Sequence, residues 1–204
     1  MSLGFAPMIA PPELPNLTRD VQYPAYFLMK RGDIRCIYKD EKFYDEKGVE
    51  FTNIHLIIYF SKLKNVGKYT LDGEMYTNTT SDADIRAILI SKDMPLPEGL
   101  KFYIYDCVVV ESLFNKLGRS YRRRLQDLRQ LMSGKVADYS KVVDVSPEIV
   151  RNAGDIIQFY RKYLKFGAKG GIIRRQDANY HFGQVTIRSG EVIELQPKSK
   201  NGGK

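Results

Sequence analysis

The stretch Lys30-Arg31-Gly32-Asp33-Ile34-Arg35-Cys36 decides how this chain is interpreted. It follows the run at 25–29 and overlaps the start of the run at 35–38, whose aromatic and branched side chains are typical of β-strands. A second stretch, Leu71-Asp72-Gly73-Glu74, falls inside another strand-like run at 69–76. Each stretch places charged side chains and a glycine against a predicted strand, so both are candidates for a functional site.

The other elements follow from hydrophobic spacing. Strands are expected at 101–110, 171–174, 184–188 and 191–195, and helices at 52–64, 82–91 and 120–132. The segment 41–48 is charged and turn-like, and the Pro-rich first twenty residues are expected to be extended. Together these elements predict one α+β domain with antiparallel sheets and peripheral helices.

A further helix is predicted from the triplet Ser146-Pro147-Glu148. Serine supplies a capping hydroxyl, proline suits the first helical position, and glutamate is favourable in the first turn. The helix is expected to run to Lys165 and to stop at Gly167, because glycine commonly follows the last turn.

Composition narrows the classes of protein. The 204 residues are 43% hydrophobic and 27% charged, which is a globular composition. The net charge of +8 favours an anionic partner such as nucleic acid, nucleotide or membrane surface. The apolar run at 56–60 is far too short to cross a bilayer. Two cysteines and two histidines cannot supply a disulfide framework or a His-rich metal site, so we expect a cytoplasmic protein with reduced thiols.

Six stretches, in order, are similar to motifs of the nucleotidyltransferase domain of ATP-dependent DNA ligases, especially short bacteriophage ones. They are residues 5–10 (FAPMIA), 30–36 (KRGDIRC), 71–74 (LDGE), 102–106 (FYIYD), 169–174 (KGGIIR) and 177–183 (DANYHFG). The resemblance extends to Leu195. It implies a ligase-type α+β domain over 1–196, with antiparallel sheets flanked by helices as in ATP-grasp folds. The tail at 197–204 is polar, Gly-rich and basic, and we expect it to be disordered. The OB-fold domain of family ligases is not expected here.

The resemblance also implies a chemistry. In that family a lysine attacks the α-phosphate of ATP and carries AMP to a DNA 5′-phosphate, with a divalent cation beside the phosphates. Lys30 stands at the nucleophile position and Arg35 at the arginine of the same motif. Glu74 stands at the carboxylate that contacts the ribose, and Tyr105 at the position that stacks on adenine.

Several positions depart from the family pattern. Gly32-Asp33 replaces Asp-Gly, which on a strand would send the carboxylate to the opposite face. Asp45 falls where an arginine grips the 5′-phosphate, and Lys169 replaces the metal-binding glutamate, so no metal ligand is assigned. The two lysines of the last motif are replaced by Glu194 and Gln196.

The substitution at position 194 has a definite sign. A charge about 5 Å from the nucleophile, at an effective dielectric constant of about 20, is worth roughly 3 kcal/mol, or about two pKa units. A lysine there lowers the pKa of the nucleophile, whereas Glu194 raises it. Because Lys169 and Glu194 have exchanged charge relative to the family, we hypothesise that they form an ion pair in the former phosphate site.

Basic residues are concentrated between positions 116 and 129, where six cations oppose only Asp127. This segment is either a solvated helix face or a surface for phosphates. The candidate nucleic-acid contacts are Arg119, Arg122, Arg123, Arg124, Arg129, Arg174 and Arg175.

The sequence therefore predicts a ligase-like protein with eroded adenylation motifs. It is expected to bind DNA or RNA in replication, repair or transcription, with a partner protein in those processes, without sealing nicks and without requiring a cofactor. The first alternative is an active DNA ligase or adenylyltransferase that uses Lys30 with ATP and Mg²⁺. The second is a protein-interaction adaptor whose basic face serves only solubility. The phage resemblance extends the cytoplasmic setting to an infected bacterial host.

Overall fold

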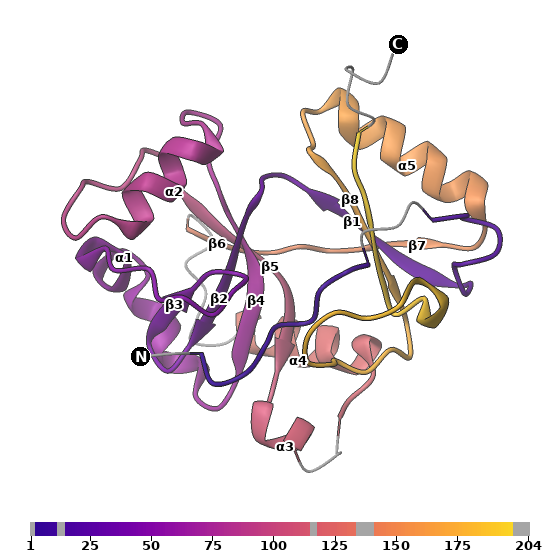
Figure 1. The fold of residues 1–204 in the computed structure, drawn as a ribbon, viewed down its shortest axis with the longest axis horizontal. Helices are drawn as coiled ribbons and strands as arrows, with labels where there is room; N and C mark the ends of the chain where they lie inside the picture. The colour runs from indigo at the N-terminus through magenta and orange to yellow at the C-terminus, as the bar shows by residue number, and fades with distance from the viewer. Residues whose placement is uncertain (1–2, 12–14, 115–117, 134–140, 198–204) are drawn as a thin grey trace.

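The computed structural model describes residues 3–11, 15–114, 118–133 and 141–197. Two sheets form its frame. The first sheet has the order β7 (Glu148–Val150), β1 (Ala25–Lys30), β8 (Gly170–Arg175), β9 (Val192–Leu195). The second has the order β3 (Lys42–Tyr44), β2 (Ile34–Lys39), β4 (Thr70–Tyr76), β5 (Lys101–Val108), β6 (Val142–Asp144). Figure 1 shows the sheets side by side, one in each half of the molecule.

The sheets are antiparallel apart from one pair. Strands β5 and β6 run parallel, and the other strand pairs have the antiparallel arrangement that the sequence predicted. The chain passes from the first sheet to the second directly, because only residues 31–33 separate β1 from β2. This short connection keeps the end of β1 close to the start of β2 and carries the stretch on which the sequence interpretation depends.

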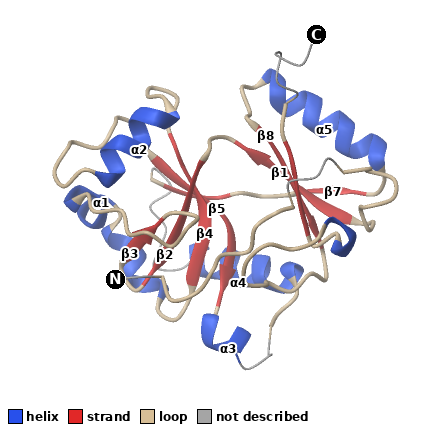
Figure 2. Cartoon of the chain, viewed as in Figure 1, coloured by secondary structure: helices blue, strands red, loops and turns tan. Residues whose placement is uncertain are grey.

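Helices cover the outer faces, as Figure 2 shows. The described helices are α1 (Ile54–Tyr59), α2 (Asp82–Ile90), α3 (Val110–Phe114), α4 (Tyr121–Ser133) and α5 (Ala153–Lys165), with 3₁₀ turns at Ser61–Val66 and Ile187–Ser189. Helix α5 packs on the first sheet, where Ile156 is fully buried with Phe27 and Ile173. Leu56 of α1 and Leu128 of α4 are buried in the core of the second sheet. Apolar burial therefore holds each sheet to its own helices.

The helix predicted to be capped by Ser146 is capped six residues later, by Asn152, and begins at Ala153. Residues Glu148–Val150 form β7, which pairs antiparallel with β1 and buries Val150 completely. Pairing at the edge of β1 satisfies backbone groups that a helix would have left open. The cap is Asn152, whose side chain accepts from the amide of Asp155. The predicted end at Lys165 and the glycine at 167, with φ of 81°, are confirmed.

Three other predictions need correction. The segment 41–48 contains strand β3, because Phe43 and Tyr44 are buried. The helix predicted at 52–64 breaks at Phe60 into α1 and a 3₁₀ turn. The strand predicted at 184–188 is a single bridge between Gln184 and Ile9, because this segment bonds to the N-terminal segment and not to β9. Most of the predicted disordered tail, residues 198–204, lies outside the described residues.

Gly73 lies where the pairing of β4 and β5 shifts register, next to Asp72. A Cβ atom at this position would lie 2.1 Å from the carbonyl oxygen of Tyr103 and 2.9 Å from the Cα of Ile104. Both neighbours belong to the backbone of the adjacent strand, so neither can rotate away. Glycine here lets Asp72 and Glu74 flank the cleft while β4 stays paired.

We expect Gly73→Ala to destabilise the protein by about 2 kcal/mol or more, because the sheet itself must shift to accept the methyl group. Urea denaturation measures this loss. Gly32→Ala is the matched control. Its Cβ would lie 3.1 and 3.2 Å from side-chain atoms of Tyr76 and Asp82, which can move, and 3.5 Å from the backbone oxygen of Met75, which is an ordinary contact distance. Equal losses for the two variants would contradict the argument.

Candidate functional site

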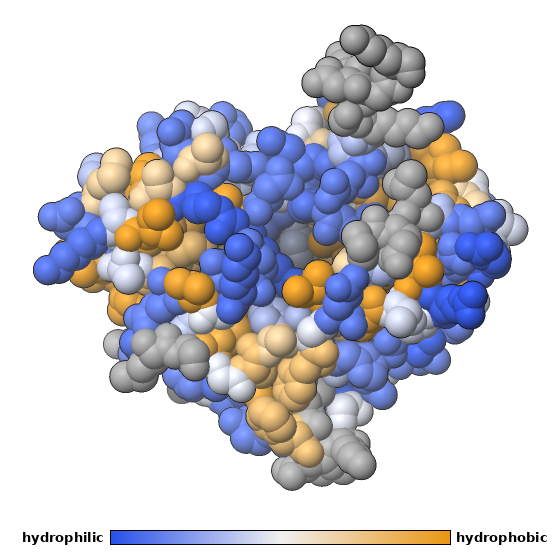
Figure 3. Space-filling model, viewed as in Figure 1, coloured by the Kyte–Doolittle hydropathy of each residue, from blue (hydrophilic) through white to orange (hydrophobic). Residues whose placement is uncertain are grey.

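A cleft lies between the two sheets, lined by residues of both. Figure 3 shows the molecule hollowed between its two halves. Its walls come from the ends of β1 and β2, from β4, β5, β8 and β9, and from the N-terminal segment. The lining residues with charged or hydroxyl side chains are Lys30, Asp33, Arg35, Asp72, Glu74, Tyr105, Arg174 and Glu194. The four predicted pocket residues, Lys30, Arg35, Glu74 and Tyr105, are thus brought to one cleft.

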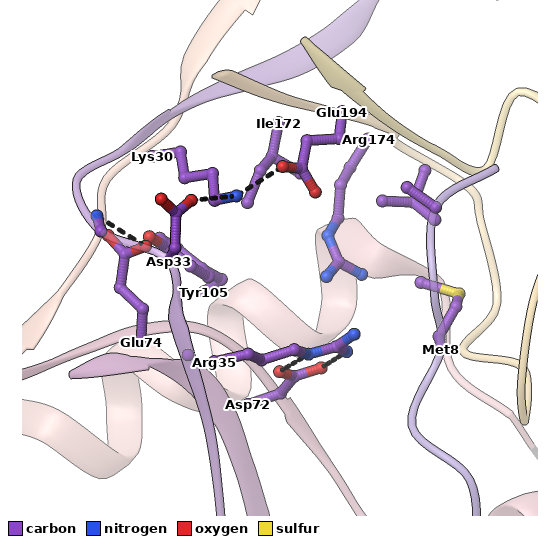
Figure 4. Close-up of a pocket in the computed structure, with 14 residues that line it drawn as sticks. Met8, Lys30, Asp33, Arg35, Asp72, Glu74, Tyr105, Ile172, Arg174 and Glu194 are labelled. Atoms are coloured by element: carbon purple, nitrogen blue, oxygen red, sulfur yellow. Dashed lines mark hydrogen bonds and ion pairs between the residues drawn. The ribbon is translucent and has the colours of Figure 1, made fainter. Parts of the chain in front are cut away.

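Lys30 lies at the end of β1 with its ammonium between two carboxylates (Figure 4). The Nζ atom is 2.5 Å from Oε1 of Glu194 on β9 and 2.9 Å from Oδ1 of Asp33. Burial lowers the pKa of Lys30, but the hydrogen bonds and charges of Glu194 and Asp33 outweigh it, and the pKa is raised. The amine is therefore held in its charged form, in the direction expected from position 194.

Two expectations about this region are corrected. Asp33 does not point away from the cleft, because residues 31–33 form a loop and not a strand, and its carboxylate reaches Lys30. The hypothesised ion pair between Lys169 and Glu194 is absent. Lys169 lies 3.3 Å from Asp82, and Glu194 accepts from Lys30 and, at 3.1 Å, from Gln196. Lys30 was the nearer cation for Glu194, because β1 and β9 flank the same strand, β8.

Glu74 holds the connection between the two sheets. Its carboxylate accepts from the amides of Arg31, at 2.7 Å, and Gly32, at 3.2 Å. The side chain is only 2% exposed. Burial raises the pKa of Glu74 to about 7, even though Tyr105, the two amides and Lys30 all favour the charged form. Glu74, which the family resemblance assigns to contact with a ribose, thus also fixes the backbone of residues 31 and 32 through two hydrogen bonds.

Arg35 and Asp72 form a bidentate pair across β2 and β4. The guanidinium Nε lies 3.0 Å from Oδ1 of Asp72 and Nη2 lies 2.7 Å from Oδ2. The hydroxyl of Tyr180 donates to the same Oδ2 atom at 2.9 Å. Burial raises the pKa of Asp72, but Arg35 more than offsets it, and the pKa is lowered. The bond from Tyr180 to Asp72 was not anticipated from the sequence.

A second buried network lies deeper, around Asp106. This carboxylate is fully buried and accepts two bonds from Arg124, at 2.7 and 2.9 Å, and one from Arg174, at 3.0 Å. Arg124 and Arg174 are 2% and 4% exposed. Because their guanidinium groups are buried and paired with Asp106, Arg124 and Arg174 are not part of a nucleic-acid-binding surface. Buried charges of this kind are stable only when paired, and removing either partner would leave the other uncompensated.

The remaining predicted arginines lie nearer to solvent. Arg122, Arg123 and Arg129 are exposed on α4. Arg119 is half exposed and bonds to Asp127, and Arg175 is bonded to Asp177 and to the carbonyl of Ser189. Asp45 folds back on its own loop, accepting from the amides of Lys47 and Val49. The exposed part of the predicted basic face is therefore the outer side of α4.

Tyr105 extends from β5 into the wall of the cleft and is 5% exposed. Burial, with the nearby Glu74 carboxylate, raises the pKa of its hydroxyl well above the usual value. Its role as a stacking platform for adenine stays a prediction.

The fold implies a site for ATP and a divalent cation, but the charges of this cleft are already paired with one another. Each of its three cationic side chains already has a carboxylate partner: Lys30 with Asp33 and Glu194, Arg35 with Asp72, and Arg174 with Asp106. Four carboxylates line the same cleft. No group of three His, Cys, Asp or Glu side chains suited to a metal ion is found in the described residues. A triphosphate or a divalent cation that entered the cleft would have to break one of these ion pairs. The residues present therefore do not fit ATP and its metal ion.

The fold matches known structures closely. Over 94% of this chain and 67% of the other, it superposes on Chlorella virus DNA ligase-adenylate with a TM-score of 0.79 at 20% identity. The ATP-dependent DNA ligase of bacteriophage T7, in complex with ATP, matches with a TM-score of 0.66 at 14% identity, over 95% of this chain and 69% of the other. A Lig E DNA ligase structure matches at 0.65 and 17%, over 91% of this chain and 70% of the other. The chain therefore has the fold of the nucleotidyltransferase domain of ATP-dependent DNA ligases, as the sequence predicted.

No protein-family model matches the sequence, and no curated protein matches it. The structure contains no helix, in its described part, that is long and apolar enough to cross a membrane.

The raised pKa of Glu74 makes a prediction about stability. Below pH 4.5 the carboxyl is protonated in both states. As the pH rises towards 7, the unfolded chain releases this proton while the folded protein retains it, so the free energy of unfolding falls by up to about 3 kcal/mol. Glu74→Gln removes this term. Denaturation of the variant and the wild type at pH 5 and pH 8 should show the variant gaining in relative stability at pH 8.

Glu98→Gln, at an exposed carboxylate, is the control and should follow the wild type. Parallel pH curves for wild type and Glu74→Gln would show that burial does not hold this proton.

Proposed function

We propose that this chain is a DNA ligase-like protein that binds nucleic acid through its basic surface and does not transfer AMP efficiently. One observation carries the proposal: the Lys30 ammonium lies within 3 Å of both Glu194 and Asp33. Attack on a phosphate requires a free amine, and two carboxylates favour the ammonium instead. They would also repel a polyphosphate that approached the same atom.

The ligase fold supports the choice of nucleic acid as partner, since the neighbouring structures are DNA ligases. The net charge of +8 supports it as well. The exposed arginines of α4, Arg122, Arg123 and Arg129, are suited to contacts with the phosphate backbone. We place the protein in DNA replication, repair or transcription on the same grounds.

A second candidate function is favoured by the gathering of Lys30, Arg35, Glu74 and Tyr105 around one cleft. This is the set that an active adenylyltransferase would use. Under this alternative a cofactor must separate Lys30 from its two carboxylates before the amine can react. The two candidates differ in one measurable product, a covalent Lys30–AMP adduct.

Incubation of the protein with ATP labelled on its α-phosphate, with Mg²⁺ or Mn²⁺, is expected to give no acid-labile adduct. An active DNA ligase run in parallel is the positive control. Label that appears on the wild type and disappears in Lys30→Ala would overturn the proposal and establish the second candidate.

A further readout within this test does not depend on ATP. Competitive acetylation of the lysines, followed by mass spectrometry, reports how much free amine each one holds. Lys30 should label slowly in the wild type and faster in Glu194→Gln. Glu50→Gln is the matched control, because Glu50 pairs with Lys42, so labelling should change at Lys42 and not at Lys30.

Nucleic-acid binding is tested at the exposed side of α4. The double variant Arg122→Glu with Arg123→Glu should weaken binding to every sequence, because phosphate contacts carry no sequence information. The slope of log affinity against log salt should fall by about two. Arg151→Glu with Lys92→Glu makes the same change in net charge at other exposed positions. Equal weakening by both pairs would mean that net charge alone attracts the nucleic acid, and no binding at low salt would leave the adaptor alternative.

A further inference from the structure

Three phenylalanines from distant parts of the chain meet on the surface. The rings of Phe114 and Phe182 lie 5.1 Å apart between centroids, tilted by 42°, and those of Phe5 and Phe182 lie 5.3 Å apart. Phe114 is 63% exposed and Phe182 is 38% exposed. Scattered exposed apolar residues are ordinary, but large rings in mutual contact form a patch that calls for an explanation. We name Phe5, Phe114 and Phe182 the phenylalanine ledge.

The ledge is held in place by the backbone. The amide of Gly183 donates to the carbonyl of Ala6 at 3.0 Å, and the amide of Ile9 donates to the carbonyl of Gly183 at 2.9 Å. These bonds tie Phe182 to the segment that carries Phe5. The rings are therefore presented by a fixed frame, and little conformational entropy is lost when a flat ligand lies against them.

The ledge adjoins the cleft. The segment that carries Phe5 continues to Met8 and Ala10, which line the cleft wall. Figure 3 shows apolar surface gathered below the hollow, over α3, on the face where the hollow opens. A chain that lay on the ledge would thus pass the mouth of the cleft.

The start of α4 is tied to the segment that leads to Phe182. The amide of Arg122 donates to the carbonyl of Gln176 and Arg124 donates to the carbonyl of Ala178. Arg122 and its neighbour Arg123 are exposed on α4. Flat apolar rings and exposed guanidinium groups, carried by segments that are bonded to each other, match the two parts of an unpaired nucleotide, its base and its phosphate.

We propose that the phenylalanine ledge is a stacking site for unpaired bases of a single-stranded nucleic acid whose phosphates contact the arginines of α4. The proposal rests on the proposed function, nucleic-acid binding, and adds the form of the ligand. A continuous duplex keeps its bases stacked on one another, so only its phosphates would be available to the arginines, and the rings would contribute nothing.

Fluorescence anisotropy with a labelled single strand of about 12 nucleotides, and with the matching duplex, tests the proposal. Phe114→Ala and Phe182→Ala should each weaken single-strand binding about tenfold and leave duplex binding and the salt slope unchanged. Phe114→Leu and Phe182→Leu keep the apolar volume without the flat ring and should weaken binding similarly. Phe166→Ala, at a phenylalanine 72% exposed beyond α5, is the control and should bind as the wild type.

The failures of the two proposals are distinguishable. If the arginine variants weaken binding and the phenylalanine variants do not, the ledge is refuted and nucleic-acid binding stands. If the wild type binds neither strand form at low salt, both proposals fall. A leucine variant that binds as the wild type while the alanine variant does not would indicate an apolar contact without stacking, and would overturn the ledge as a base platform.

Discussion

Pairing of charges in a poorly solvated cleft is the constraint on which this structure depends. A buried cation is tolerated only beside a carboxylate, and in this cleft Lys30, Arg35 and Arg174 each meet one. Lys30 and Glu194 pair within the first sheet and Arg35 and Asp72 within the second, whereas Arg174 of β8 and Asp106 of β5 pair between the two sheets. The same pairing that makes the cleft stable also occupies the groups that nucleotide chemistry would need.

Glu74 connects this electrostatic arrangement to the fold. The chain crosses between sheets in three residues, and two of their amides donate to this one carboxylate. Gly73 brings β4 close enough to β5 for Glu74 to be buried beneath the crossing. The motif at residues 71–74 resembles a ligand-binding signature, yet its Glu74 also stabilises the connection between the two sheets. The presence of this motif therefore does not by itself demonstrate that a ligand is bound.

Much of the fold was predictable, because long strands and the amphipathic α4 leave periodic patterns in the sequence. The errors have physical reasons. The triplet at 146–148 has every local feature of a helix start, yet Val150 completes the core against β1, and tertiary pairing outweighs local preference. In the site, motif positions located Lys30 and Glu74, whereas the partners of the charged groups depend on distances between strands. Arg124 illustrates this point, since a run of arginines does not reveal which one turns inward to Asp106.

Charge is therefore divided between two regions. The cleft holds three cations against four carboxylates, while the protein as a whole carries a net charge of +8. The excess positive charge therefore comes from outside the cleft, and it includes the exposed Arg122, Arg123 and Arg129 of α4, which an anion can meet with little desolvation cost. An adenylyltransferase needs the opposite distribution, with unpaired cations inside to receive phosphates. A long polyanion that lies along the surface satisfies the observed distribution, and this is why nucleic acid, and not a nucleotide in the cleft, is the ligand that the charges favour.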